Sequence, residues 1–374
     1  MTRALTIVHS EVSNGWGGQE IRVFTEMKAC RDRGHRMLLC APENTQIYRK
    51  CCDEGFPVFA FTDARLKYPS TILRLKKFFQ REQVDVVNTH SSRDGWLAGI
   101  AAHLAGVPLL IRSRHIEVDY PNRFLSHIAF RTLPHHVITT SEKISNRLIR
   151  ELHLPARKVT CIATGIDLSR FNPQIPGRLR EELNLAPGTL MVGMVSVLRS
   201  WKGHRFFLGA AREILDQRQD VHFVIAGEGD GRAEISALIH ELDLKGHVTL
   251  LGHREDVPNV LASLDVLVLP STAHEGIPQI ILQAQAMGKA VVGTTVGGIP
   301  EVVRDNETGL LAPPRDGVLL AEKIGQLLES KDLRTRLGTQ ALAVAQADYS
   351  LEAMCRRLDC VYEKRLGEFS RRKR

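Results

Sequence analysis

The stretch HEGIPQIILQAQAMGKAVVGTTVGGIPEVV, residues 274–303, decides the fold class of this chain. Pro278 is acceptable in the first turn of a helix and Gly288 is typical of a helix end, so the stretch predicts a helix from about Ile277 to just before Gly288. The apolar run KAVVGT, 289–294, predicts a buried strand, which exits into a Gly-Gly turn. A helix that leads directly into a buried strand is typical of an α/β fold.

The same alternation of apolar runs and amphipathic stretches extends over the whole chain and restarts after the polar stretch 171–188. In the first half it predicts strands at 4–10, 36–42, 57–61, 84–90, 108–113 and 136–140, with helices at 19–33, 70–83, 95–105 and 142–152. In the second half it predicts strands at 191–198, 221–227, 247–252, 266–271 and 289–294, with helices at 203–216, 231–242, 257–263, 278–287 and 316–329. The stretch 331–369 is predicted to be helical throughout.

This pattern predicts two Rossmann-like, doubly wound domains, each with a parallel sheet between layers of helices. We expect an N-terminal domain over 1–172 and a C-terminal domain over 173–350. Residues 351–374 are expected to form a C-terminal helix and basic tail that pack back on the N-terminal domain. Ligands of open parallel sheets bind outside the carboxyl ends of the strands, so we expect the ligand in a cleft between the two domains.

Composition restricts the class of protein. The chain is 43% apolar and 25% charged, and no apolar run approaches the roughly 20 residues of a membrane span. Its start is interpreted as a first strand and not as a signal peptide. The seven cysteines have no metal-ligand spacing, which predicts reduced cytosolic thiols and no metal site.

The positive charge is concentrated in the first half of the chain. Residues 1–170 contain 25 lysines and arginines against 16 acidic residues, whereas 171–374 contain 25 against 26. A basic half attracts an anionic partner, such as a phosphorylated ligand, an acidic membrane or a nucleic acid. Charge alone does not choose among these.

Several candidates in the first half follow strands. The turn NGWGGQE, 14–20, contains glycines that let a ligand approach the backbone, or it is only a tight turn. His90 and His115 each follow a strand, where they face a cleft or are simply satisfied histidines. Arg112 and Arg114 could meet phosphate or cap the edge of the sheet, and Asp94 could be only the N-cap of the next helix.

The second half offers cations and a carboxylate at equivalent places. Arg199 and Lys202 leave a buried strand just before a helix and suit a diphosphate, unless they are a solvated helix start. Glu275 precedes the helix near 277, close to its positive end, and Gln283 lies eight residues on, so both side chains can face one side of the cleft. A carboxylate there can accept hydrogen bonds from the hydroxyls of a polyol.

These motifs together resemble the retaining glycosyltransferase family 4, which has the GT-B fold and is metal-independent. The resemblance covers nearly the whole chain and is most specific in E-G-I-P-Q-I-I-L-Q-A-Q-A-M-G-K-A-V-V followed by GGIPE. Further matching motifs are GWGGQE, THSSRDG, RSRH, TGIDLSRF, WKGH, AGEGDG and GLLAPPRD.

The resemblance implies that the N-terminal domain, 1–172, binds the acceptor and that the C-terminal domain, 173–350, binds the nucleotide sugar. It also implies a set of site residues. The catalytic set it implies is Glu275 on the sugar hydroxyls, Lys202 and Arg199 on the diphosphate, and His115 beside the donor sugar. The donor-binding set is Gly17 and Gly18, Gly227, His253 and Arg254 near the base, Gly276, Ile277 and Pro278 at the diphosphate turn, and Gln283 on the nucleoside. It implies no metal and no cofactor besides the nucleotide sugar.

The sequence departs from the family pattern at two places. The second glutamate of the family, which grips the nucleotide ribose, is Gln283 here, and an amide lacks the charge-assisted bond to a hydroxyl. The family's G-R-L before the lysine is Ser196-Val197-Leu198, with Arg199 following. Both departures put the strength of donor binding in doubt.

The sequence therefore predicts a transferase that moves a sugar from a nucleotide diphosphate sugar to a hydroxyl of a glycan or lipid-linked acceptor, with retention of configuration. Lipopolysaccharide or another cell-surface polysaccharide is the expected product. We expect a cytoplasmic enzyme that is peripheral to the inner membrane face, because residues 70–82 combine Lys76 and Lys77 with Phe78 and Phe79. An ordinary helix that packs those apolar residues inward is the alternative.

Three other functions fit parts of the sequence. A nucleotide-sugar epimerase would share the fold, and a non-catalytic nucleotide-sugar-binding protein would fit Gln283. A nucleic-acid partner has only the charge in its favour, without a basic motif that carries aromatic residues, so none is expected.

Overall fold

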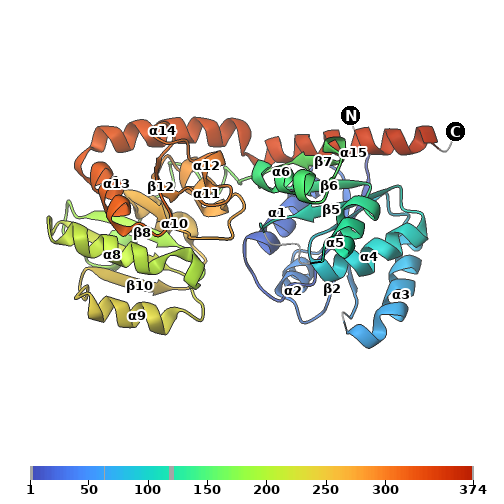
Figure 1. The fold of residues 1–374 in the computed structure, drawn as a ribbon, viewed down its shortest axis with the longest axis horizontal. Coiled ribbons are helices and arrows are strands. Elements are labelled where there is room, and N and C mark those ends of the chain that lie inside the picture. The colour runs from blue at the N-terminus through green and yellow to red at the C-terminus, as the bar shows by residue number, and fades with distance from the viewer. Residues whose placement is uncertain (1–2, 63, 118–121, 373–374) are drawn as a thin grey trace. The chain divides into compact units, whose positions relative to one another are not determined.

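The computed structural model describes residues 3–62, 64–117 and 122–372. The chain divides into two compact units, Met1–Gly165 together with Leu351–Arg374, and Ile166–Ser350. Each unit is a parallel sheet with helices on both faces (Figure 1), which confirms the predicted pair of Rossmann-like domains.

The first unit contains a seven-stranded sheet in the order β3-β2-β1-β4-β5-β6-β7. Its strands are β1 Thr6–Ser10, β2 Arg36–Ala41, β3 Val58–Ala60, β4 Val86–Thr89, β5 Leu109–Arg114, β6 His136–Thr139 and β7 Val159–Cys161. Its helices are α1 Gly18–Asp32, α2 Gln46–Asp53, α3 Tyr68–Arg81, α4 Ser92–Ala105, α5 Arg123–His127, α6 Glu142–Glu151 and α15 Leu351–Arg372, with short turns η1 Arg65–Lys67, η2 Ile128–Thr132 and η3 Ala156–Lys158.

The second unit contains a six-stranded sheet in the order β10-β9-β8-β11-β12-β13. Its strands are β8 Leu190–Val195, β9 Val221–Ala226, β10 Val248–Gly252, β11 Val266–Leu269, β12 Ala290–Thr294 and β13 Leu310–Ala312. Its helices are α7 Leu179–Glu182, η4 Ser200–Lys202, α8 His204–Leu215, α9 Arg232–Glu241, α10 Val257–Ser263, α11 Gln279–Ala286, α12 Ile299–Val302, α13 Gly317–Glu329 and α14 Lys331–Asp348.

Alternate residues of each buried strand pack on opposite faces of the sheet, as the pleat requires. In β1, Ile7 belongs to the core formed with α1 and α15, whereas its neighbour Val8 belongs to the core formed with α3 and α4. In β8, Val192 and Met194 pack on the face covered by α8 and α13. Because both faces are covered, the strands read as continuous apolar runs in the sequence.

The C-terminal helix α15 packs on the first unit, although the rest of that unit ends near residue 165. Its Met354, Leu358 and Tyr362 are buried in the same core as Val23 and Met27 of α1. Asp359 of α15 accepts a hydrogen bond from Arg33 and lies 3.2 Å from Nε2 of His35. Helix α15 is thus held on the first unit by apolar contacts with α1 and by the polar cluster of Asp359 with Arg33 and His35.

The structure corrects several local predictions. The predicted helical stretch 331–369 consists of two helices, since α14 ends at Asp348 and α15 begins at Leu351, the predicted start of the C-terminal helix. Helix α11 begins at Gln279, two residues after the predicted start, with Pro278 as its N-cap. Asp94 is not the N-cap of α4; Ser91 is the N-cap, and Asp94 sits at N3 of a capping box.

The predicted cationic and apolar membrane surface on residues 70–82 is wrong in its aromatic part. Phe78 and Phe79 are buried in the core of the first unit, and Phe78 stacks on Phe59 with ring centroids 4.4 Å apart. These rings lose water-exposed apolar area by facing inward, which is the alternative that the sequence left open. Leu73 and Lys77 remain exposed on the outer face of α3.

Candidate functional site

Both sheets reverse their strand order at one point, between β1 and β4 in the first unit and between β8 and β11 in the second. The chain crossovers leave in opposite directions from such a point, so the loops that follow the two strands separate and leave room for a ligand. Of the predicted donor residues, Lys202, Glu275, Gly276, Ile277 and Pro278 lie in the segments that follow β8 and β11, at the reversal point of the second sheet.

Lys202 and Glu275 meet across this reversal point. Lys202 ends the turn η4 after β8, and Glu275 lies in the loop after β11. The Nζ of Lys202 donates to Oε1 of Glu275 at 2.6 Å, and the hydroxyl of Ser271 donates to the same oxygen at 2.6 Å. The Oε2 of Glu275 accepts no hydrogen bond from any residue that the structure describes.

Burial strengthens this ion pair. The side chain of Glu275 is only 7% exposed and that of Lys202 is 20% exposed. A charge pair in such a position interacts more strongly than one in water, although both groups lose solvation. The pair places a fixed cation and an oriented carboxylate next to each other at the sheet edge.

Backbone contacts hold the loops around the pair in place. Gly203 has a φ of +82°, and a Cβ there would lie 1.9 Å from the carbonyl oxygen of Pro270. Gly297 has a φ of +57°, and its Cβ would lie 2.1 Å from the carbonyl oxygen of Glu275. Thr272 also donates its N–H to the carbonyl of Trp201 at 2.7 Å. Close main-chain contacts therefore hold the loops after β8, β11 and β12 together.

The remaining donor candidates on this loop are buried beside the pair. Gly276, Ile277 and Pro278 are all buried, and Gly276 accepts a hydrogen bond from the N–H of Gly298 at 3.2 Å. Gln283 lies on α11 with its side chain partly exposed. Their burial makes the turn rigid, which suits a site that must hold a phosphate group in one geometry.

Gly227 is required by the fold itself. Its φ is +144°, and a Cβ there would lie 1.9 Å from the carbonyl oxygen of Ser196. The exits of β8 and β9 can therefore approach each other only with glycine at this position. The contact explains the residue without a ligand.

Arg199, His253 and Arg254 lie at the exits of β8 and β10. Arg199 is exposed and its guanidinium lies 5.1 Å from the ring centroid of Trp201. Arg254 pairs with Asp256 at 2.6 Å and Glu182 at 3.0 Å, and these carboxylates raise its pKa. The charge of Arg254 is thus already compensated, whereas His253 is exposed.

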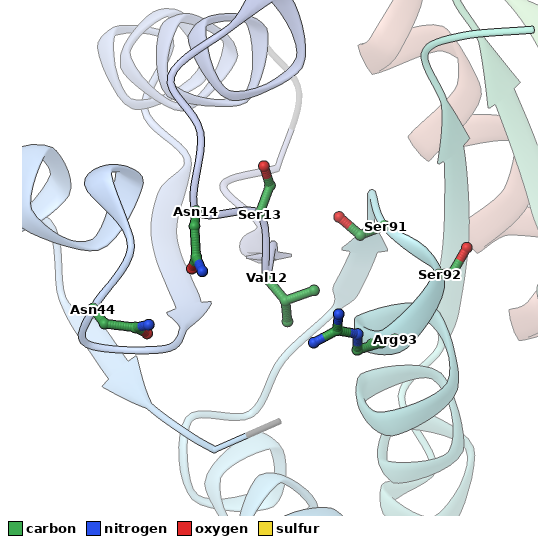
Figure 2. Close-up of a pocket in the computed structure, with 7 residues that line it drawn as sticks. All are labelled: Val12, Ser13, Asn14, Asn44, Ser91, Ser92 and Arg93. Carbon is green, nitrogen blue, oxygen red and sulfur yellow. The ribbon is translucent and has the colours of Figure 1, made fainter. Parts of the chain in front are cut away.

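A cavity opens at the reversal point of the first sheet. It has a volume of about 380 Å³, within the usual size of small-ligand sites. Figure 2 shows Asn14 and Asn44 on one side, on the loops after β1 and β2, and Ser91, Ser92 and Arg93 on the other, at the start of α4. Val12 and Ser13 complete its lining. Hydroxyls, amides and one cation suit a polar, hydroxylated ligand.

Glu11 supports this cavity and was not singled out from the sequence. It directly follows β1, is fully buried, and accepts hydrogen bonds from the N–H groups of Val12 and Ser13 and from the hydroxyl of Ser91. Burial raises the pKa of its carboxyl, against the lowering effect of these hydrogen bonds. The signal that could have identified it is a carboxylate immediately after a predicted strand.

The glycine turn before α1 differs from the prediction in one respect. The N–H of Gly17, expected to face an anion, donates to Oε2 of Glu20 at 2.8 Å. A Cβ at Gly15 or Gly17 would meet no atom closer than 3.5 Å, and neither residue has a positive φ. The fold alone therefore does not require glycine at Gly15 or Gly17, which leaves close approach of a ligand as a reason for them. Gly18 begins α1.

His115 lies directly after β5, in the first unit, and is 7% exposed. Its Nε2 lies 2.9 Å from Nδ1 of His90, and burial lowers the pKa of His115 well below its ordinary value. His115 and His90 are therefore neutral members of one buried cluster, which the sequence treated as two separate candidates.

Neither a metal site nor a membrane-spanning helix is found in the described part of the chain. In that part of the chain no group of three or more His, Cys, Asp and Glu side chains is arranged to hold a metal ion. Nor does any described helix have the length and apolar character that crossing a membrane requires.

The chain is similar to known families over most of its length. Residues 177–344 match the family described as glycosyl transferases group 1, and residues 16–170 match the one described as Glycosyltransferase Family 4. A UDP-Gal:alpha-D-GlcNAc-diphosphoundecaprenol alpha-1,3-galactosyltransferase of Escherichia coli is 31% identical over 264 residues, covering 67% of this chain and 68% of the relative. An N,N'-diacetylbacillosaminyl-diphospho-undecaprenol alpha-1,3-N-acetylgalactosaminyltransferase of Campylobacter jejuni is 27% identical and covers 84% and 88%.

Solved structures share the fold. A glycosyltransferase from Rickettsia africae superposes with a TM-score of 0.89 at 20% identity, covering 97% of this chain and 99% of that one. The Anabaena protein Alr3699/HepE, in complex with UDP and glucose, superposes with a TM-score of 0.85 at 22% identity, covering 96% and 99%. At this level of identity the likeness shows the fold alone.

The ion pair at the site predicts a measurable coupling. Lys202→Met and Glu275→Gln should each lower the free energy of unfolding by about 2 kcal/mol, because each leaves the partner without its counter-charge. The double variant should lose at least about 1 kcal/mol less than the sum. Urea denaturation of the full-length chain measures all four proteins.

The exposed pair Arg232–Glu228, at 2.8 Å, provides the control cycle. Arg232→Met with Glu228→Gln should show a coupling below about 0.5 kcal/mol, since solvent screens that pair. Additive losses at Lys202 and Glu275 would mean that the pair is not formed in solution.

Proposed function

This chain belongs to the group 1 glycosyltransferases and is an enzyme that transfers a glycosyl group, and we propose that its donor is a nucleotide diphosphate sugar. We propose further that a hydroxyl of a glycan or lipid-linked acceptor receives the sugar, with retention of anomeric configuration. The observation that carries the proposal is the contact between Lys202 and Glu275 at the reversal point of the second sheet.

The geometry of the pair suits a sugar diphosphate. The open Oε2 of Glu275 can accept a hydrogen bond from a sugar hydroxyl, while Lys202 faces the phosphate next to that sugar. When the bond between the anomeric carbon and the diphosphate oxygen breaks, the oxygen keeps the electron pair and the diphosphate gains negative charge. Lys202, helped by Arg199 and by the N–H groups at the start of α8, would stabilise that charge.

The nucleoside end of the donor is assigned to Gln283. It lies on α11, the helix that follows Glu275, and its partly exposed amide can donate to and accept from a ribose hydroxyl. Because an amide is neutral, its bonds to the ribose are weaker than those of a carboxylate. His253, exposed at the exit of β10, is proposed to lie near the base.

The acceptor is assigned to the cavity in the first unit. Its lining of Asn14, Asn44, Ser91 and Ser92 offers donors and acceptors for sugar hydroxyls, and Arg93 offers a cation for a phosphate of a lipid-linked acceptor. The basic excess of the first half of the chain favours such an anionic acceptor. Two relatives named for diphosphoundecaprenol-linked sugars support this class of acceptor.

We propose that the enzyme is cytoplasmic, works at the inner membrane face and contributes to lipopolysaccharide or another cell-surface polysaccharide. Support comes from an exposed surface on and before α3, formed by Leu66, Lys67, Leu73 and Lys77, which we name the α3 surface. Leu66 is 99% exposed and Leu73 is 55% exposed. Exposed leucines between lysines suit the interface of an anionic bilayer.

Substitution of the ion pair tests the site assignment. Glu275→Ala and Lys202→Ala should each lower kcat by about 100-fold or more, since each removes a group that acts on the reacting sugar diphosphate. A panel of UDP-, GDP- and ADP-sugars with release of nucleoside diphosphate as the readout identifies the donor first. NMR of the product then gives its anomeric configuration, and turnover should persist in EDTA.

Glu241→Ala and Lys245→Ala are the matched controls, because both residues are exposed and lie before β10, at the opposite edge of the sheet. They should turn over as the unchanged protein does. Normal turnover by both Glu275→Ala and Lys202→Ala would place the reaction elsewhere.

Replacing Gln283 on α11 with the glutamate of the family pattern tests the role of Gln283. Gln283→Glu should lower the Kd for the nucleoside diphosphate about fivefold, since a charge-assisted hydrogen bond to the ribose is worth about 1 kcal/mol more than a neutral one. Isothermal titration measures the change, with Gln340→Glu on the exposed face of α14 as control. An equal or weaker affinity of Gln283→Glu would remove Gln283 from the nucleoside site.

Liposome flotation tests the α3 surface. The unchanged protein should float with vesicles that contain anionic lipid at low salt, and Lys67→Glu with Lys77→Glu should weaken binding at least tenfold, since each lysine near an anionic membrane contributes about 1 kcal/mol. Lys245→Glu, on the second unit, should float normally. A protein that stays wholly unbound at low salt contradicts the membrane assignment.

A further inference from the structure

Three buried histidines form a row across neighbouring strands of the first sheet. His9 lies in β1, His90 directly follows β4, and His115 directly follows β5, and these strands are adjacent in the sheet. Their exposed fractions are 0%, 2% and 7%. We name His9, His90 and His115 the histidine row.

Hydrogen bonds between ring nitrogens connect the row. The Nδ1 of His9 lies 2.8 Å from Nε2 of His90, and Nδ1 of His90 lies 2.9 Å from Nε2 of His115. The rings of His9 and His90 are nearly parallel, with an interplanar angle of 7°. Both distances are those of ordinary hydrogen bonds, so each contact needs one N–H and one lone pair.

The environment keeps the three rings neutral. Burial lowers the pKa of His9 to about 3 and lowers the pKa values of His90 and His115 well below the ordinary value. The charged and titratable groups around the row are Arg22 and Glu26 of α1, Asp94 of α4, Arg112 and Arg114 of β5, and Tyr362 of α15. The arginines further disfavour a charged ring.

Neutral rings leave only two proton arrangements for the row. In one, His115 donates from Nε2 to His90, and His90 donates from Nε2 to His9. His9 then carries its proton on Nε2, and the Nδ1 of His115 is a lone pair. In the other arrangement every proton sits on Nδ1, the bonds run the opposite way, and the Nδ1 of His115 is a donor.

The nitrogen atom at each end of the row lacks a hydrogen-bond partner among the described residues. The Nδ1 of His115 and the Nε2 of His9 are buried and make no hydrogen bond with any residue that the structure describes. The group that faces Nε2 of His9 is Glu26, whose Oε1 lies 3.7 Å away. Glu26 is 1% exposed, and its Oε2 lies 3.5 Å from Nε of Arg22. An ionised Glu26 attracts an N–H of His9, whereas a protonated Glu26 offers a proton to it.

We propose that His9 and His90 are positioning residues that transmit the ionisation state of Glu26 to His115. With Glu26 ionised, the row holds His115 as the Nε2–H tautomer, so that its buried Nδ1 is a hydrogen-bond acceptor. This inference rests on the proposed function, because it is the resemblance to glycosyltransferase family 4 that implies a role for His115 next to the donor sugar. It adds Glu26, His9 and His90 to the groups that determine how His115 can bind.

Uptake of one proton reverses the row. The arrangement with Glu26 protonated contains four protons, one on the carboxyl and one on each Nδ1, whereas the arrangement with Glu26 ionised contains three. Burial raises the pKa of Glu26 above its ordinary value, and Arg22 opposes that rise. His115 therefore accepts above the pKa of Glu26 and donates below it.

Nitrogen-15 NMR of the histidine-labelled full-length chain, without donor, tests the row. At pH 7.5 the spectra should show His9, His90 and His115 as Nε2–H tautomers and none of them as an imidazolium down to pH 5. Glu26→Gln, which keeps the shape of the side chain, should convert His115 to a mixture of tautomers or to Nδ1–H. A purely structural role for Glu26 would leave His115, two rings away, unchanged.

His136→Phe is the matched control. His136 is buried in β6 and bonds to Thr160 at 2.8 Å, outside the row. Its loss should leave the spectrum of His115 unchanged, whereas His90→Phe removes the hydrogen bond between the row and His115 and should leave His115 as a mixture of tautomers at pH 7.5. Mixed tautomers of His115 in the unchanged protein, or no response to Glu26→Gln, would overturn the proposal.

Turnover separates this proposal from the proposed function. Once a donor is found, Glu26→Gln should lower kcat at least about tenfold with the donor KM within twofold, and His136→Phe should change neither. A kcat unchanged by Glu26→Gln would overturn the role of the row. A chain that binds no nucleotide sugar, but gives the expected spectra, would refute the proposed function and leave the proton arrangement of the row established.

Discussion

The reversal of strand order in a parallel sheet is the constraint on which the site depends. Crossovers that leave β8 and β11 in opposite directions keep the loops after these strands apart at one place along the sheet edge. Main-chain packing then fixes those loops, since Gly203 lies against Pro270 and Gly297 against Glu275. Lys202 and Glu275, 73 residues apart in the sequence, meet at 2.6 Å because the loops that bear them cannot move independently.

The first unit uses the same constraint with different side chains. At its reversal point a buried carboxylate, Glu11, holds Ser91 and the start of the loop after β1, and the cavity above them is lined by amides and hydroxyls. In the second unit, the segment after β8 carries Lys202. In the first unit, the equivalent loop after β1, residues 11–17, contains no lysine or arginine. One topology therefore places a lysine and a carboxylate at the edge of one sheet and amides and hydroxyls at the edge of the other, and the local sequence decides which groups stand there.

Buried charge is handled in two ways in this protein. Lys202 and Glu275 keep their charges by pairing with each other, so that a cation and a carboxylate can both be held in a poorly solvated place. The histidine row instead stays neutral, because desolvation and the nearby arginines oppose protonation, and it satisfies its nitrogens by mutual hydrogen bonds. The ion pair suits a charged ligand, and the neutral histidine row suits a ligand with hydroxyl groups.

The sequence alone determined the two Rossmann-like domains and the position of nearly every strand, because apolar runs covered on both faces are local signals. It also singled out Lys202 and Glu275, which lie in segments that follow strands, and His115, which directly follows β5. Short elements such as α2, β7 and β13 carry too few residues to show a period, and Phe78 could be placed inward or outward until its stacking partner Phe59 was known. Only the tertiary structure brought Lys202 to Glu275, Ser91 to Glu11, and His9 to His90 and His115. Those contacts depend on which strands lie next to each other. Strand order is a property of the folded sheet and not of any local stretch of sequence.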